Sequence, residues 1–206
     1  MILEAKNISF KYNKDSRQIL KDFSLKVESR ERVGLVASSG FGKTTFCKIL
    51  AGYERPDEGE VLLDGKNIAD MKGYMPVQMI WQHPEQSVNP RLRMKEVLAE
   101  GNQVEERIIK GLGIEPDWMN RFPAEISGGE MQRFCIARAL GKGTEFILAD
   151  EISTMLDLIT QSQIWHFLTL ECDRRGIGLI AVSHSMELLD KICTRIVNLE
   201  EMMETK

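Results

Sequence analysis

The stretch from Ala37 to Thr45, ASSGFGKTT, combines glycines, a lysine and hydroxyl side chains in the spacing of a phosphate-binding loop. In the pattern G-x-x-x-x-G-K-[ST], the glycines let backbone N–H groups close around phosphates. The lysine reaches the terminal phosphates, and the hydroxyl after it is offered to magnesium. The sequence therefore predicts a nucleotide site with the binding residues Ser38, Ser39, Gly40, Phe41, Gly42, Lys43, Thr44 and Thr45.

Alanine stands at position 37, where the pattern asks for its first glycine. If the backbone of Ala37 needs a positive φ, the penalty is about 1 kcal/mol, whereas each charge-assisted hydrogen bond contributes about 1.5–3 kcal/mol. We therefore expect the loop to bind phosphate. For this motif taken alone, a plain glycine turn before a helix remains the alternative.

The segment FILADE is an apolar run that ends in two carboxylates, Asp150 and Glu151. Adjacent residues of a strand point to opposite faces, so the two carboxylates need not share one task. Asp150 suits a ligand of magnesium-bound water, and Glu151 suits the base that activates an attacking water. Taken alone the pair is a weak signal, because charged residues commonly close strands.

A second anion site is indicated by ISGGEMQR, residues 126–133. Ser127 and Glu130 have the spacing of a capping box that starts a helix. Gly128 and Gly129 would each cost such a helix about 1 kcal/mol relative to alanine. That cost is understandable if an anion must approach bare amides at the helix start.

The elements that would position these groups follow from hydrophobic periodicity. Residues 2–12 and 18–27 alternate as two strands of an antiparallel sheet, and a strand at 32–37 leads through the loop into a helix at 43–51. Further buried strands are predicted at 60–64, 77–81, 145–150, 178–184 and 194–199. Helices near 159–174 and 185–192 separate the later strands, which predicts an α/β core with a mainly parallel sheet.

Residues from about 84 to 143 have helical spacing and no convincing strand. We therefore expect a single domain over residues 1–206, in which a P-loop NTPase core carries an N-terminal antiparallel β subdomain and an inserted helical subdomain.

The composition of the chain argues against several classes of protein and site. The 27 basic and 31 acidic residues give a net charge of -4 without a long block of one sign, so nucleic acid is not an expected partner. The four cysteines lack the spacing of a metal site or a disulfide framework. We also expect neither a signal peptide nor a membrane span.

The motifs GFGKTT, IWQHP, ISGGEMQR, FILADE, MLD and AVSHS follow one another in an order that resembles the nucleotide-binding domain of an ATP-binding cassette transporter. The resemblance covers nearly the whole chain. It implies ATP and Mg²⁺ as ligands, with catalytic roles for Glu151 as the base, His184 as a contact to the γ-phosphate and Gln82 as a magnesium sensor that faces the permease. Thr44, Gln82 and Asp150 are the implied magnesium residues.

The resemblance assigns further roles around a dimer of two cassettes. Tyr12 would stack on adenine, although an aromatic residue on an edge strand is the plain alternative. Ser127, Gly128 and Gly129 would cap the γ-phosphate bound to the opposite subunit. Asp157 would belong to the loop that crosses the dimer interface. Glu130 and Ile152 depart from the residues that the family commonly has, without removing a group that the chemistry needs.

Within the family, MIWQHPEQSVNPRLRMKEVLAE resembles the ATPases of peptide and nickel importers. The implied function is ATP hydrolysis that powers solute import, with peptide ahead of nickel or another metal chelate. The implied partners are transmembrane permease subunits, a second ATPase and, indirectly, an extracytoplasmic solute-binding protein. We expect the second ATPase to be a paralogue, with a second copy of this chain as the alternative. The implied location is peripheral, on the cytoplasmic face of the membrane.

Two other classes compete with transport. A soluble cassette ATPase of repair would carry a long coiled coil, but Gln82 and Ser127 are only 45 residues apart (127 − 82), and translation-type members usually join two cassettes in one chain. A nucleotide-binding module without hydrolysis would be favoured if Ala37 or Glu130 impaired catalysis. A phosphate-release assay separates that module from an ATPase.

Overall fold

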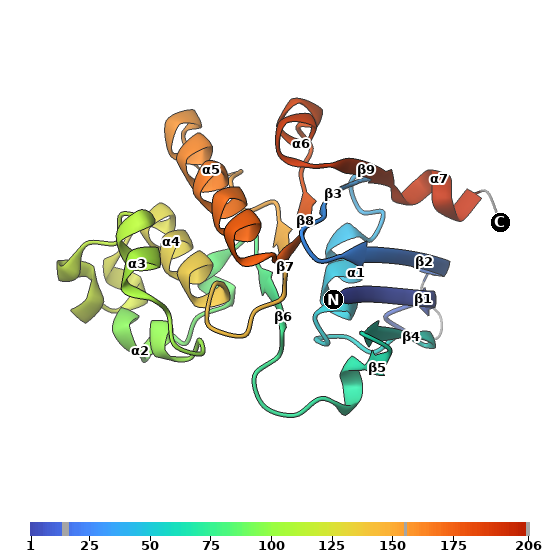
Figure 1. The fold of residues 1–206 in the computed structure, drawn as a ribbon, viewed down its shortest axis with the longest axis horizontal. Coiled ribbons are helices and arrows are strands. Elements are labelled where there is room, and N and C mark those ends of the chain that lie inside the picture. Colours follow the sequence, from blue (N-terminus) through green and yellow to red (C-terminus); the bar gives the residue numbers. More distant parts are fainter. Residues whose placement is uncertain (14–16, 155, 205–206) are drawn as a thin grey trace.

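Two sheets organise the computed structural model, which describes residues 1–13, 17–154 and 156–204 (Figure 1). The antiparallel sheet has the order β2-β1-β4-β5, formed by β1 (Ile2–Phe10), β2 (Leu20–Glu28), β4 (Glu58–Leu63) and β5 (Lys66–Asn67). The second sheet has the order β6-β7-β8-β3-β9, formed by β3 (Arg32–Val36), β6 (Val77–Ile80), β7 (Phe146–Asp150), β8 (Gly178–Val182) and β9 (Arg195–Asn198). All its paired strands run parallel, so the predicted α/β class is confirmed.

Strands β7 and β8 form the centre of the parallel sheet because their sequences are apolar on both faces. FILAD and GLIAV are buried at every position, and they pair in register from Phe146 opposite Gly178 to Asp150 opposite Val182. Continuous apolar runs of this kind are typical of strands that helices cover on both sides. The strand predicted at 60–64 forms β4, which pairs with β1 and so belongs to the antiparallel sheet. The loop predicted between β1 and β2 lies partly outside the described residues.

Seven α-helices connect or cover the strands within the described residues: α1 (Lys43–Leu50), α2 (Met94–Ala99), α3 (Glu106–Gly111), α4 (Gly128–Ala139), α5 (Leu158–Arg175), α6 (Met186–Ile192) and α7 (Leu199–Glu204). Helix α1 lies with the antiparallel sheet on one side of the parallel sheet, and α2 to α5 lie on the other (Figure 1). Each side has its own apolar core. Phe23 of β2 meets Phe46 of α1 in the first core, with ring centroids 4.8 Å apart, and Trp165 of α5 is buried in the second.

The described residues between β6 and β7 form helices and short 3-10 turns without a strand, as the sequence predicts. Among the contacts between this helical region and α5, two are made by α3. Arg107 of α3 donates to the buried carboxylate of Glu171 on α5. A Cβ atom on Gly111 would lie 2.1 Å from the Phe167 ring, so only glycine allows α3 to lie this close to α5.

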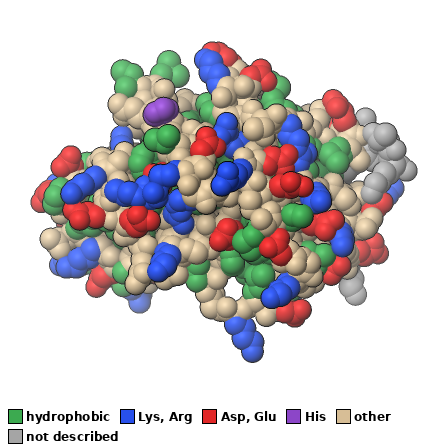
Figure 2. Space-filling model, in the orientation of Figure 1, with side chains coloured by type: hydrophobic (Ala, Val, Ile, Leu, Met, Phe, Trp, Pro, Cys, Tyr) green, Lys and Arg blue, Asp and Glu red, His purple; other side chains and the backbone are tan. Residues whose placement is uncertain are grey.

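The face shown in Figure 2 carries basic and acidic side chains side by side. This distribution agrees with the near balance of 27 basic and 31 acidic residues. In the part of the chain that the structure describes, no helix is both long enough and apolar enough to cross a membrane.

The Arg107–Glu171 pair gives a test of how the helical region is held. Glu171 has only 5% of its side chain exposed, so Arg107→Ala should reduce the free energy of unfolding by about 2–3 kcal/mol, because a buried carboxylate loses its main cation. Lys110→Ala is the matched control on the same helix, since its partner Glu106 is exposed, and should cost about 0.5 kcal/mol or less. Urea unfolding measures both. Equal losses would contradict a special role for the buried pair.

Candidate functional site

The predicted phosphate loop connects the end of β3 to the start of α1. Gly42 is the N-cap of α1 with φ 101°, and a Cβ atom there would lie 2.6 Å from Ile19 Cγ2, so this position requires glycine. Positive φ also occurs at Gly40 but not at Ala37. The alanine therefore carries no left-handed strain, and the penalty considered for it does not arise.

The Lys43 side chain crosses the phosphate loop and contacts its backbone. The side chain is buried, and its Nζ donates to the backbone oxygens of Ala37 at 2.7 Å and of Ser38 at 3.1 Å. The loop thus places an ammonium group and the free N–H groups at the start of α1 around one point, an arrangement suited to an anion. Glycines are needed for the turn, and the lysine supplies the charge.

Tyr12 lies beside α1, immediately after β1. Its hydroxyl is 3.0 Å from the Thr45 hydroxyl, and its ring packs edge-on against Phe10 with centroids 5.0 Å apart. The side chain is nevertheless 49% exposed. The Tyr12 ring is held by its contacts with Thr45 and Phe10 and is still partly exposed, so a planar group can stack on it. This placement is compatible with the predicted role of Tyr12 in stacking on adenine.

The two carboxylates at the end of β7 have different environments, as the sequence analysis expects. Asp150 is 2% exposed, and its Oδ1 is a buried atom without a hydrogen-bond partner. Burial raises the pKa of Asp150, and the charge of Glu151 adds to this rise, while Thr44 and Lys43 oppose it. A buried carboxylate oxygen that lacks a donor is suited to a cation or to cation-bound water.

Glu151 is held by residues from the two neighbouring strands. Gln82, after β6, donates from Nε2 to Glu151 Oε2 at 3.1 Å, and His184, after β8, has its Nε2 2.9 Å from Glu151 Oε1. The strands β6, β7 and β8 are adjacent and parallel, so their carboxyl ends meet at one edge of the sheet. The three residues predicted to be catalytic therefore form one cluster, at the edge where such sheets bind ligands.

The SGG segment forms the start of α4 with the predicted capping box. Ser127 Oγ accepts from the Glu130 N–H at 3.3 Å, and Glu130 Oε2 accepts from the Ser127 N–H at 2.6 Å. A Cβ atom on Gly129 would lie 3.2 Å from Leu156 Cδ2, whereas one on Gly128 would meet nothing within 4 Å. Gly128 thus leaves open space at the helix start, where another group can approach the amides.

The predicted residue Asp157 has a local structural role. Asp157 is the N-cap of α5, and its Oδ1 accepts from the N–H groups of Ile159 and Thr160. These bonds, chiefly those from Thr160, lower the pKa of Asp157.

The SGG segment and the phosphate loop lie in different parts of the fold, since α4 packs in the second apolar core and α1 in the first.

Sequence reasoning missed Glu200, a residue of α7. Its carboxylate accepts a hydrogen bond from the Ser38 N–H in the phosphate loop. Hydrogen bonds from the Ser38 side chain and N–H lower the pKa of Glu200, and the charge of Lys43 contributes to the same shift. The contact exists because β9, which precedes α7, is the sheet neighbour of β3. No motif near residue 200 signals it.

The donor set is compatible with magnesium bound together with a substrate. In the described part of the chain, no three His, Cys, Asp or Glu side chains gather as a metal cage. Mg²⁺ is commonly held by one or two carboxylates, waters and substrate phosphates instead. Asp150, whose carboxyl group is hydrogen-bonded by the Thr44 side chain and whose Oδ1 has no partner, fits that mode of binding.

Comparison with known proteins agrees with this geometry. The family profile described as ABC transporter matches residues 20–154. The chain is 31% identical over 218 residues to the oligopeptide transport ATP-binding protein OppF of Streptococcus mutans, covering 95% of this chain and 70% of that protein. It is 29% identical over 204 residues to the nickel import ATP-binding protein NikE of Rhodospirillum rubrum, covering 90% and 74%.

A solved structure has the same fold. It is a dimeric post-hydrolysis state of the ATP-binding cassette MJ0796 bound to ADP and Pi, which superposes with a TM-score of 0.81 at 26% identity. The match covers 95% of this chain and 93% of that one.

The burial of Asp150 predicts a pH-dependent stability. Since its pKa is raised in the folded protein, ionisation of Asp150 opposes folding as pH rises from the ordinary aspartate range through the raised pKa. Without nucleotide or magnesium, Asp150→Asn should therefore gain stability over the wild type as pH increases from about 4 to 7. Denaturant unfolding in EDTA at several pH values measures this, with the exposed Asp173→Asn as the control. A difference that does not change with pH would contradict the expectation.

Proposed function

Because the chain belongs to the ATP-binding cassette transporter family, whose ATPase subunits hydrolyse ATP to drive transport, we propose that it powers the import of a peptide. The observation that carries the proposal is the Glu151 carboxylate, held on both oxygens at the sheet edge that also carries the phosphate loop. A site built only to hold a nucleotide would not need a base oriented in this way.

Glu151 is proposed as the base of hydrolysis. Its side chain is 14% exposed, so it is partly accessible to solvent while most of it is shielded from bulk water. Glu151 takes the proton from the attacking water, and the new bond forms between the water oxygen and the γ-phosphorus as the bond to ADP breaks. Gln82 and His184 each contact one oxygen of the Glu151 carboxylate and so orient it.

Thr44, Gln82 and Asp150 are proposed as the residues that would hold Mg²⁺ together with the bound nucleotide. When bound, Mg²⁺ would supply positive charge to the phosphate oxygens. Asp150 contributes its buried, unpartnered Oδ1, and the positive charge would offset the cost of ionising this carboxyl group. Gln82 connects this group to the base through its hydrogen bond to Glu151.

ATP is proposed to bind along the phosphate loop, with adenine against Tyr12. The exposed Tyr12 ring supports this, since it is fixed next to α1 by its hydroxyl contact with Thr45. The loop residues expected to contact phosphate are Ser38, Ser39, Gly40, Phe41, Gly42, Lys43, Thr44 and Thr45. Lys43 would provide the main cation for the phosphates.

Each site is proposed to be completed by the partner subunit in a dimer. Support comes from the separation of Ser127, Gly128 and Gly129 from the chain's own phosphate loop and from the open space at Gly128. ATP would then hold two cassettes together, with Asp157 near the interface, and hydrolysis would release them. We expect the partner to be a paralogue, with a second copy of this chain as the alternative.

The motion is proposed to pass to transmembrane permease subunits through the helical region at about 84–143, which we treat as a subdomain of a single domain over residues 1–206. Gln82 lies at the entry to this region and touches the base, so it can report the state of the site. The protein would work at the cytoplasmic face of the membrane. A solute-binding protein on the other side would be an indirect partner.

The relatives bear on the cargo. Among them are an oligopeptide transport protein and a nickel import protein at similar identity. Peptide leads because several relatives are described as peptide import proteins, including one from Brucella ovis at 33% identity. Nickel or another metal chelate is the second candidate.

Replacing the base should trap the closed dimer. Glu151→Gln should lower ATP turnover by about 10²–10⁴-fold and leave ATP binding intact, since it removes the proton acceptor but keeps the side-chain shape. Light scattering with Mg-ATP should then show a shift from monomer to dimer for this variant if two copies pair.

Three other outcomes of this experiment are informative. A variant that binds ATP and stays monomeric would indicate a different ATPase as the partner. Loss of ATP binding would mean that the phosphate loop with Ala37 is inadequate. Full turnover would remove Glu151 from the role of base.

Glu200 should weaken ATP binding because its negative charge lies beside the phosphate loop. Glu200→Gln keeps a hydrogen-bond acceptor for Ser38 and should lower the Kd for ATP by about 2- to 10-fold at low salt, with a smaller change at 0.5 M salt. Glu201→Gln on the same helix is the matched control. Calorimetric titration measures all three proteins, and weaker binding by Glu200→Gln would instead mean that the carboxylate positions the loop.

A further inference from the structure

The turn that presents Glu151 is held in an unfavourable backbone conformation. Glu151 has φ 50°, in the left-handed region that non-glycine residues rarely adopt. Its N–H donates to the Val182 oxygen at 3.1 Å, and its oxygen accepts from the N–H and hydroxyl of Thr154. A strained residue persists when its surroundings hold it, so contacts further along this turn influence the direction of the Glu151 side chain.

One such contact joins the turn to α5. The indole Nε1 of Trp165 donates to Ser153 Oγ at 3.0 Å. Both residues are buried, with Ser153 6% and Trp165 2% exposed. Ser153 lies two residues after Glu151, and Ile152 between them is buried in the second apolar core. The bond therefore fixes the turn to a rigid helix immediately next to the base.

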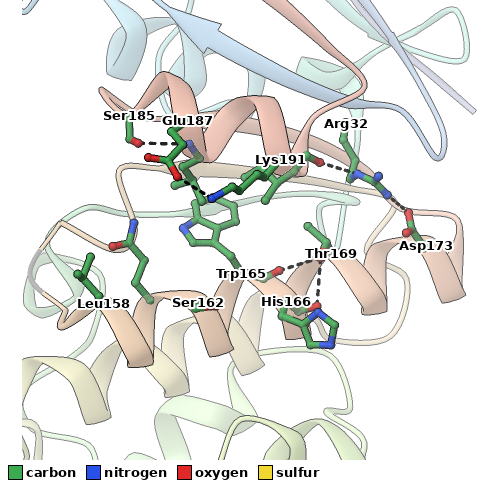
Figure 3. A pocket seen from close by; sticks show the side chains of 13 residues that line it. Arg32, Leu158, Ser162, Trp165, His166, Thr169, Asp173, Ser185, Glu187 and Lys191 are labelled. Atoms are coloured by element: carbon green, nitrogen blue, oxygen red, sulfur yellow. Dashed lines mark hydrogen bonds and ion pairs between the residues drawn. The ribbon is translucent and has the colours of Figure 1, made fainter.

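The position of Trp165 is suited to holding the turn that carries Glu151. Its ring lies between α5 and α6, at the edge of a cavity of about 580 Å³ (Figure 3). Helix α6 begins directly after Ser185, the neighbour of His184, and Ser185 also lines this cavity. Trp165 thus lies near the segments that carry both the base and its histidine contact. An indole N–H has only one hydrogen bond to give, and in this fold it goes to Ser153.

The same turn also reaches α4. The Leu156 N–H donates to the Ser153 oxygen at 3.1 Å, and Leu156 Cδ2 lies over Gly129. Ser153 is therefore bonded to α5 and lies close to two functional segments. Glu151 precedes it by two residues, and Leu156, which is hydrogen-bonded to it, contacts the SGG segment.

We propose that Trp165 is a positioning residue for catalysis, which acts through its hydrogen bond to Ser153 to hold the Glu151 carboxylate between Gln82 and His184. The proposal rests on the proposed function in one respect, since it takes Glu151 as the base. A role of Trp165 in core packing alone would not involve the Ser153 hydroxyl.

The test uses variants that break the bond from each side. Ser153→Ala and Trp165→Phe should each lower kcat for ATP about 3- to 10-fold and change KM by less than about 2-fold, because phosphate binding does not depend on this turn. The double variant should be no slower than the slower single variant, since both remove the same bond. Ser153→Thr keeps the hydroxyl and should retain kcat within about 2-fold.

Other results would overturn the proposal. These are an unchanged kcat in Ser153→Ala, additive losses in the double variant, or a loss in Ser153→Thr as large as in Ser153→Ala. If Trp165→Phe does not fold, as judged by circular dichroism, Ser153→Ala and Ser153→Thr decide the question by themselves.

Glu151→Gln measured alongside separates the two hypotheses. If it loses turnover while Ser153→Ala does not, the positioning role fails and the proposed base remains. If it keeps full turnover, the base assignment fails, and the positioning role fails with it.

Discussion

The site depends on the alignment of parallel strands that carry their functional residues at the same ends. Gln82, Glu151 and His184 follow three neighbouring strands, β6, β7 and β8, and the phosphate loop follows β3, the next strand in the sheet. Parallel pairing brings these four carboxyl ends to one edge. The contacts of Glu151 with Gln82 and His184 are a consequence of that register, so the buried apolar runs of β7 and β8 determine the geometry of the chemistry.

The same edge carries groups that work against folding. Asp150 is a buried carboxylate with an unpartnered oxygen, and Glu151 has a left-handed backbone. Both features cost free energy in the isolated chain, and both lie where a cation and a phosphate would interact with them. The fold can hold them because β7 and β8 are buried at every position, while binding of the substrate would offset the cost at Asp150.

Two apolar cores lie on opposite sides of the parallel sheet whose edge carries the site. Helix α1 belongs to the first core and presents the phosphate loop, whereas α4 belongs to the second and presents the SGG segment. Close to Glu151, Ser153 contacts α5 and Leu156 contacts α4. The residues that follow the base therefore contact both α5 and the SGG segment.

The sequence by itself determined the local features. The phosphate loop, the capping box of Ser127 and Glu130, the buried strands and the absence of strands between 84 and 143 depend on patterns within short segments, which local energetics decide. Tertiary structure decided the rest. Ala37 has no positive φ, Glu200 meets Ser38 across 162 positions, and Trp165 holds Ser153 from another element. These contacts depend on which strands become neighbours, and periodicity along the chain contains no information about them.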